Sequence, residues 1–224
     1  MTEICPLQSI PVTYTRDRCA YVVDLTLPTV ESTAFGRQGP EVQSQSREPD
    51  QTDVDRVFAD FVPMQLECLR NYTTLLPHVA EMTQAFQKED IKIGSTTGFV
   101  RSMVDILEAD AKEQSYVPDA SVAGDEVENG ARPQPFMVYR NLDLMVVHPI
   151  QSIVKVGDTV SGVGEALEAG CWGGVGIARY SNYMDIDSLD QAENLPECEI
   201  QRRLTETREI LQKAGAHYVI DTFD

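Results

Sequence analysis

Basic residues are scarce in this chain, and their scarcity argues against the protein classes that depend on them. The 224 residues include 18 lysines and arginines against 36 aspartates and glutamates, which gives a formal net charge of −18 and a sequence pI of about 4.4. No run of lysine and arginine forms a local basic patch, so the chain would repel nucleic-acid phosphates and anionic lipid. We therefore expect neither nucleic acid nor a membrane as a partner.

Long apolar runs and paired cysteines are also missing. No apolar run approaches the roughly 20 residues that cross a bilayer, and the first residues lack the basic and apolar regions of a secretory signal. Five cysteines are scattered without a Cys-x-x-Cys pair, at Cys5, Cys19, Cys68, Cys171 and Cys198, and there are only three histidines. We therefore expect no zinc site and no disulfide framework, and we predict a globular, cytoplasmic protein.

The first 51 residues differ in composition from the rest of the chain. Glu31 to Gln51 is built from small, polar and acidic residues with Phe35 as its only aromatic, so this stretch is predicted to be a flexible linker. Before it, Ala20 to Leu27 is rich in β-branched and aromatic residues and stops at Pro28, which predicts one short strand.

Helical spacing begins near Asp53, is predicted to break at Pro63, and resumes from Pro77 to Lys88. From there strands and helices alternate. The predicted strands lie at 91–98, 120–123, 152–156, 172–177 and 217–220, and the helices at 101–112, 136–144, 164–169 and 200–214. This alternation predicts a parallel sheet covered on both faces, with ligands at the carboxyl ends of its strands.

Small polar residues end the strand predicted at 91–98. Ser95, Thr96, Thr97 and Gly98 close this strand before a helix begins. Hydroxyls and unpaired amides at a helix N-terminus form an anion site, because the helix dipole favours negative charge there. The pattern predicts phosphate binding, and a plain helix cap is the alternative.

Two further polar loops precede helices. Asp158 directly follows a second strand, where a carboxylate beside an anion site suits Mg²⁺; a turn or N-cap aspartate is the alternative. Arg132 lies in a stiff, proline-bracketed loop before a helix. A guanidinium is suited to bidentate phosphate contact, so Arg132 is predicted to bind phosphate; the alternative is an ordinary surface arginine in a loop.

These loops together resemble one enzyme family. The run Ile91–Gly98, the Arg132-Pro133-Gln134-Pro135 loop, the run Ile153–Ser161 and the terminal Gly215–Ile220 are similar, spacing included, to phosphonoacetaldehyde hydrolase of the haloacid dehalogenase superfamily. The match covers about residues 48–224.

The resemblance implies an α/β fold with a haloacid-dehalogenase-like Rossmannoid core and a parallel sheet. Here the helical cap is truncated and the amino-terminal segment is divergent. On this basis the chain divides into a divergent segment with its linker (1–51), a remnant of the helical cap with a linking helix (52–88) and the hydrolase core (89–224).

The resemblance also implies chemistry. Family members use Mg²⁺ in phosphonate catabolism to hydrolyse the C–P bond of phosphonoacetaldehyde, which yields acetaldehyde and phosphate. An aspartate nucleophile takes the phosphoryl group, and a cap lysine forms an imine that acts as the electron sink. By motif, Ser95, Thr96, Thr97 and Gly98 match the loop that holds the phosphoryl group. Arg132 matches the catalytic basic residue that neutralises this group, and Asp158 matches the Mg²⁺ ligand.

The chain departs from the family at the nucleophile and the cap. The family motif Asp-x-Ala-Gly-Thr does not occur in residues 1–60. The nearest candidate nucleophile is Asp24; the alternative is that Asp24 is only an acid at the end of a strand, in a segment that replaces the family's own. In this superfamily the nucleophile strand is central, so Ala20–Leu27 either fills that place or the sheet is broken. No lysine precedes Lys88, so the residue that would form the imine is absent.

We therefore expect a phosphonoacetaldehyde hydrolase-like protein in which C–P hydrolysis is impaired. The alternatives are a catalytically inactive relative that binds phosphate and Mg²⁺, or a truncated gene model. The expected partner is a small phosphonate or phosphate. The reduced cap argues against the family's homodimer and leaves Phe58, Phe61 and Leu66 as an exposed apolar patch.

Overall fold

A parallel six-stranded sheet forms the centre of the protein. The structure is a computed structural model that describes residues 20–24, 51–186, 191 and 194–223. All the strand pairings are parallel, and the strand order is β3-β2-β1-β4-β5-β6. The strands are β1 (Ala20–Asp24), β2 (Lys92–Thr96), β3 (Ala120–Val122), β4 (Ile153–Gly157), β5 (Gly173–Ile177) and β6 (Tyr218–Ile220).

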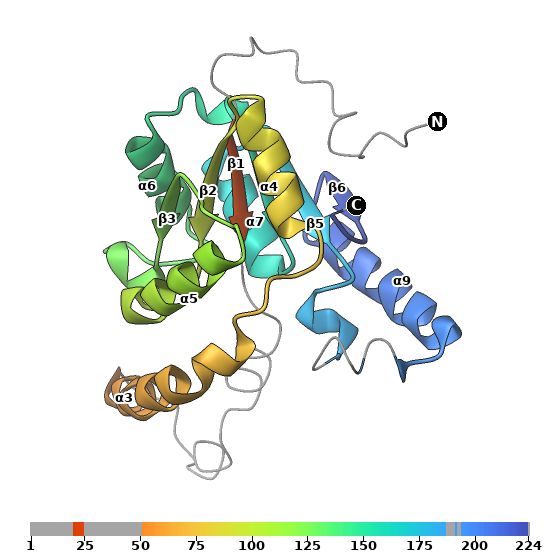
Figure 1. The fold of residues 1–224 in the computed structure, drawn as a ribbon, viewed down its shortest axis with the longest axis horizontal. Helices are drawn as coiled ribbons and strands as arrows, with labels where there is room; N and C mark the ends of the chain where they lie inside the picture. The colour runs from red at the N-terminus through yellow and green to blue at the C-terminus, as the bar shows by residue number, and fades with distance from the viewer. Residues whose placement is uncertain (1–19, 25–50, 187–190, 192–193, 224) are drawn as a thin grey trace.

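The strand predicted near the amino terminus fills the gap in the sheet. β1 lies beside β2 (Figure 1) and pairs on its other side with β4. Val22 is opposite Gly94 of β2 and Lys155 of β4. The prediction is confirmed for Ala20–Asp24, and its last three residues lie outside the described part of the chain. A paired central strand satisfies backbone groups of β2 and β4 that would otherwise be buried without partners.

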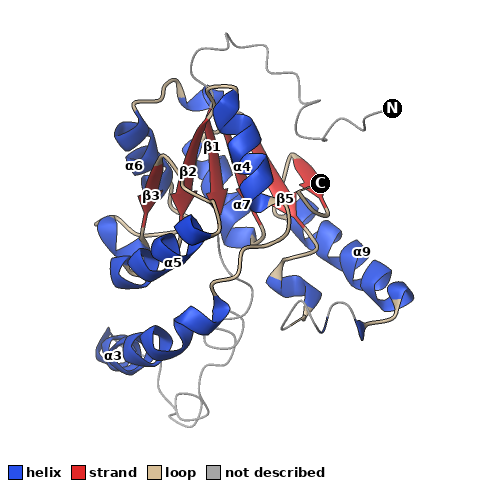
Figure 2. Cartoon of the chain, in the orientation of Figure 1, coloured by secondary structure: helices blue, strands red, loops and turns tan. Residues whose placement is uncertain are grey.

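Helices cover both faces of the sheet (Figure 2). On one face lie α4 and α5, and Val79, Met82 and Phe86 of α4 pack against Ile93, Val154 and Val156 of the strands. On the other face, α6 and α7 pack against Ile153, and Leu211 of α9 lies over Gly176. Burial on both faces explains why β4 and β5 are buried throughout. The helices of these layers are α4 (Val79–Lys88), α5 (Arg101–Glu113), α6 (Phe136–Met145), α7 (Val160–Ala169) and α9 (Glu197–Lys213).

One helix, α3 (Gln51–Cys68), lies apart from the sheet (Figure 1). It is continuous through Pro63, so the predicted break there is wrong. Proline removes one backbone donor, but the carbonyl that would have received it belongs to exposed Ala59, where water can take its place. Of the predicted apolar patch only Phe58 is exposed, because Phe61 and Leu66 are partly buried against the cluster around Leu69.

The start of α7 also differs from the prediction. The helix begins at Val160, four residues before the predicted start, because Thr159 caps it: the Thr159 hydroxyl accepts a hydrogen bond of 3.0 Å from Gly162 N–H. The glycines at 162 and 164 weaken the helical pattern in the sequence, although the cap compensates for them. None of the described helices has the combination of length and apolar character that a membrane span requires.

Candidate functional site

The carboxyl ends of neighbouring strands open into one cavity. Thr97, which directly follows β2, and Asp158, which directly follows β4, both line it, as does Ser95 within β2. The cavity continues between α4 and α5, and its volume is about 80 Å³. The structure thus brings together three of the residues that the sequence predicts to meet.

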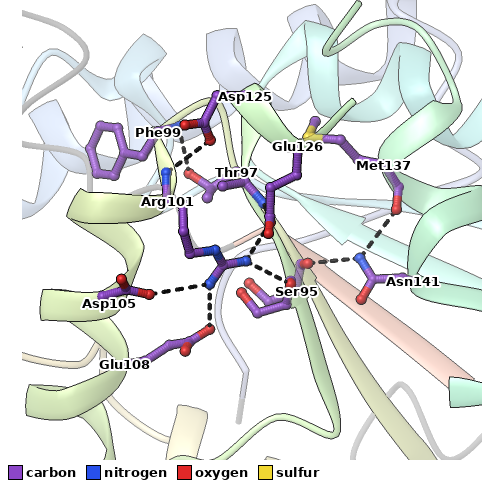
Figure 3. Close-up of polar contacts among 12 residues, drawn as sticks. Ser95, Thr97, Phe99, Arg101, Asp105, Glu108, Asp125, Glu126, Met137 and Asn141 are labelled. Atoms are coloured by element: carbon purple, nitrogen blue, oxygen red, sulfur yellow. Dashed lines mark hydrogen bonds and ion pairs between the residues drawn. The ribbon is translucent and has the colours of Figure 1, made fainter. Parts of the chain in front are cut away.

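Thr97 is held in a fixed position at the polar end of the cavity. Its hydroxyl oxygen accepts a hydrogen bond of 3.2 Å from Phe99 N–H (Figure 3), and its own N–H donates to the Val122 carbonyl. Both bonds tie the loop after β2 to its surroundings. Within the described part of the chain, the hydroxyl hydrogen of Thr97 remains to donate toward a ligand oxygen.

Thr96 lies on the other face of the sheet. Its hydroxyl donates to Glu165 at 3.2 Å and accepts from the Lys155 ammonium at 3.0 Å, and that ammonium lies 3.2 Å from the same carboxylate. Successive side chains of a strand point to opposite faces, so Thr96 and Thr97 cannot both face one ligand. The side chain of Thr96 therefore contacts the buried Lys155–Glu165 pair beneath α7, rather than the cavity for which the sequence predicted it.

Asp158 lies in the turn between β4 and α7. Its side chain is largely buried, and its backbone carbonyl accepts a hydrogen bond of 2.6 Å from the Ser181 hydroxyl. This contact fixes the turn from the side of β5. Sequence reasoning missed Ser181, and the only available signal was a small polar residue shortly after the strand at 173–177.

Asp24 ends the central strand. Its backbone is in register with Thr96 of β2, and β4 pairs on the other side with Val23 opposite Val156. The side chain of Asp24 is outside what the structure describes. Asp24 and Asp158 thus come from the ends of adjacent strands.

Magnesium is compatible with these donors. No group of three or more acidic, cysteine or histidine side chains occurs in the described residues. Mg²⁺ does not require one, since it commonly uses one or two carboxylates and fills its other positions with water and phosphate oxygens. The largely buried oxygen donors of Asp158 therefore fit the ion without further protein ligands.

Arg132 lies in the loop before α6. Its neighbour Pro133 lies against α7, where a Cβ placed on Gly164 would come within 3.1 Å of the proline ring. The loop is thus packed beside the helix that follows Asp158. Arg132 itself is not among the residues that line the cavity.

Asn141 and Arg101 hold the loops around the site (Figure 3). Fully buried Asn141 of α6 donates to the Ser95 carbonyl at 2.8 Å and so ties β2 to α6. Arg101, in the first turn of α5, donates to Glu126 and to the Ser121 carbonyl, and so anchors the chain after β3. Burial tends to raise the pKa of Glu126, but the hydrogen bonds from Arg101 and from Ala123 N–H, together with the charge of Arg101, outweigh it and the pKa is lowered.

Comparison with known proteins shows which sequences this chain is similar to. No family model matches the chain. It is 40% identical over 174 residues to a bifunctional phosphonoacetaldehyde hydrolase/aminoethylphosphonate transaminase of Clostridioides difficile, and 36% and 37% identical to phosphonoacetaldehyde hydrolases of Nitratidesulfovibrio vulgaris and Bacillus cytotoxicus. Each match covers 78% of this chain but only 27%, 61% and 65%, respectively, of the relative. The chain thus matches less than two thirds of each of these relatives.

Solved structures give the same fold. A phosphonoacetaldehyde hydrolase like protein from Oleispira antarctica superposes with a TM-score of 0.82 at 24% identity, over 92% of this chain and 88% of that one. A haloacid dehalogenase superfamily hydrolase from Geobacter sulfurreducens gives a TM-score of 0.51 at 15% identity, over 71% and 89% of the two chains. Likeness at these identities establishes the fold alone.

The parallel sheet with polar residues at its central strand ends is that of a haloacid-dehalogenase-like hydrolase fold. In sequence, the chain is similar to phosphonoacetaldehyde hydrolases. The predicted fold class and the predicted family resemblance are therefore confirmed.

Proposed function

We propose that the carboxyl edge formed by β1, β2 and β4 binds a phosphoryl or phosphonyl group together with Mg²⁺, and that the C–P hydrolysis named for the relatives is impaired in this chain. The observation that carries the proposal is the shared cavity of Thr97 and Asp158. A hydroxyl donor and a carboxylate at one cavity mouth suit an anion bridged to a divalent cation.

Each side chain would have a distinct task at this edge. The hydroxyls of Thr97 and Ser95 would donate to phosphoryl oxygens, and Arg132 would neutralise their charge from the loop before α6. Asp158, with Asp24 from the adjacent strand end, would hold Mg²⁺, which when bound supplies positive charge to the phosphoryl oxygens. Asp24 is also the candidate nucleophile, because it ends the central strand of the sheet.

The lysines explain the proposed impairment. The chain has five, and none of them lines the cavity. Lys155 is buried on the opposite face and bonded to Thr96 and Glu165. The other four are exposed at the surface, namely Lys88, Lys92, Lys112 and Lys213. Without an imine, cleavage of the C–P bond would leave the enolate of acetaldehyde in place of a neutral enamine, so that step loses its stronger electron sink.

Reduction with borohydride in the presence of phosphonoacetaldehyde and Mg²⁺ tests this proposal. We expect no covalent adduct at any lysine and little or no acetaldehyde, together with measurable Mg²⁺-dependent binding of inorganic phosphate. An adduct on a lysine, with acetaldehyde released at a rate that Asp24→Asn abolishes, would show that the imine route is intact.

The same measurements distinguish a catalytically inactive protein from a slow enzyme. Phosphate binding with no acetaldehyde above the background set by Asp24→Asn would favour a binding protein. Acetaldehyde production that depends on Asp24 but forms no lysine adduct would favour slow turnover without the imine.

A further inference from the structure

The turn that carries Asp158 is held by the chain that follows the neighbouring strand β5. The Asp158 carbonyl accepts a hydrogen bond of 2.6 Å from the Ser181 hydroxyl. Two residues later, Val160 N–H donates to the Tyr183 hydroxyl at 3.2 Å. These two contacts lie on either side of Thr159 and join the turn between β4 and α7 to the segment 181–183, which we call the clamp.

The clamp is itself fixed by its surroundings. Ser181 is 2% exposed, and its hydroxyl oxygen accepts a second hydrogen bond, of 3.3 Å, from Tyr183 N–H. The next residue, Met184, is fully buried in a cluster with side chains of α7 and α9. Arg203 of α9 donates to the Met184 carbonyl at 2.8 Å. The clamp is therefore packed into the core, and it can hold the Asp158 turn in one place.

A cation in the proposed site would join two groups that the fold holds separately. Asp158 would ligate it from the clamped turn, and the other oxygen would belong to the phosphoryl group at Thr97, which its bonds to Phe99 and Val122 fix in position. Because both sides are held, the gap between them limits the size of the ion that fits. Mg²⁺ needs oxygen ligands at about 2.0–2.1 Å in near-ideal octahedral geometry, whereas Ca²⁺ accepts about 2.3–2.6 Å and irregular geometry.

We propose that the clamp positions Asp158 and thereby makes the site select Mg²⁺ over the larger Ca²⁺. Ser181 and Tyr183 are positioning residues, since they contact the backbone of the turn and act on the cation through Asp158. The proposal rests on the function proposed above, in which Asp158 holds the cation beside a phosphoryl group. Without the clamp the turn could move by the few tenths of an ångström that separate the bond lengths of the two ions, so the preference for Mg²⁺ would fall.

Calorimetric titration of methylphosphonate into the full chain, at a fixed concentration of either Mg²⁺ or Ca²⁺, tests the proposal. The wild-type chain should bind this probe at least roughly tenfold more tightly with Mg²⁺ than with Ca²⁺. Ser181→Ala should weaken binding with Mg²⁺ about threefold to tenfold, the effect of about one lost hydrogen bond, and should leave binding with Ca²⁺ within about twofold of the wild type. Tyr183→Phe should shift the ratio in the same direction but by less, because its contact is longer and more exposed.

Two substitutions at the opposite edge of the sheet are matched controls. Ser152 directly precedes β4 and Tyr218 opens β6, so both lie at the amino ends of parallel strands, away from Asp158. Ser152→Ala and Tyr218→Phe remove the same kinds of hydroxyl, and both variants should keep the wild-type affinities with each ion. A general loss of stability would weaken binding with both ions in the same proportion, so the ratio of the two affinities distinguishes positioning from destabilisation. If Ser181→Ala does not fold, Tyr183→Phe still decides.

The outcomes separate this inference from the function on which it rests. Binding of methylphosphonate that requires Mg²⁺, with the wild-type ratio retained in Ser181→Ala and Tyr183→Phe, would overturn the role of the clamp and leave the proposed function standing. Equal affinities of the wild-type chain with Mg²⁺ and Ca²⁺ would do the same. Absence of binding with either ion in a folded wild-type chain would overturn both.

Discussion

Removal of the buried ammonium of Lys155 should destabilise the fold severely. Lys155 is 1% exposed and Glu165 is fully buried, and the ammonium lies 3.2 Å from the carboxylate beneath α7. The substitution Lys155→Met keeps a long side chain but leaves the Glu165 charge buried without this cation. Loss of one member of a buried ion pair costs about 3–5 kcal/mol, a large share of the roughly 5–15 kcal/mol that stabilises a typical domain.

A double-mutant cycle in urea isolates the pair from the packing around it. Lys155→Met combined with Glu165→Met removes both charges, so the double variant should recover most of the lost unfolding free energy. Lys92→Met is the matched control, because its partner Asp119 lies at the surface and exposed pairs contribute about 0–1 kcal/mol. A loss below about 1 kcal/mol for Lys155→Met, or a double variant as unstable as the single one, would refute this account of the buried pair.

Three further outcomes are expected. Thr97→Val should weaken Mg²⁺-dependent phosphate binding at least roughly tenfold in calorimetry, because a hydrogen bond to a charged group is lost, while Thr205→Val at an exposed position of α9 should not. Thr159→Ala should lower the unfolding free energy by about 1 kcal/mol through loss of the α7 cap, and an unchanged urea midpoint would contradict the cap's role. The lowered pKa of Glu126 stabilises the fold above the ordinary glutamate value of about 4.5 and ceases to do so as the pH falls through the lower folded value, so Glu126→Gln should flatten the acid side of the stability profile.

The strand ends could be predicted because their chemistry is local in sequence. An apolar strand followed by small polar residues predicted the loop at Ser95–Gly98, and an acid after the strand predicted at 152–156 suggested Asp158 as a Mg²⁺ ligand. The structure adds which face of the sheet each side chain of a strand points to, and this decides which of two successive residues faces the ligand. Thr96 and Thr97 are alike in sequence, and only the alternation about β2 separates them.

The buried pair escaped prediction for a different reason. Lys155 and Glu165 are ten positions apart, on a strand and on the following helix, so no spacing rule joins them. A lysine within an otherwise apolar strand was the available signal, since an ammonium is rarely buried without a partner. Ser181 was missed because its role depends on the turn that tertiary packing creates.

The central claim is that a single Mg²⁺-held phosphoryl group binds where β2 and β4 end. Titration of inorganic phosphate into the protein, with Mg²⁺ and then with a chelator in its place, tests this claim most directly. The account predicts binding that disappears with the chelator and in Asp158→Asn, while Asp143→Asn, at an exposed position of α6, binds as the wild type does. Absence of phosphate binding in a folded wild-type chain, or equal binding by Asp158→Asn, would contradict it.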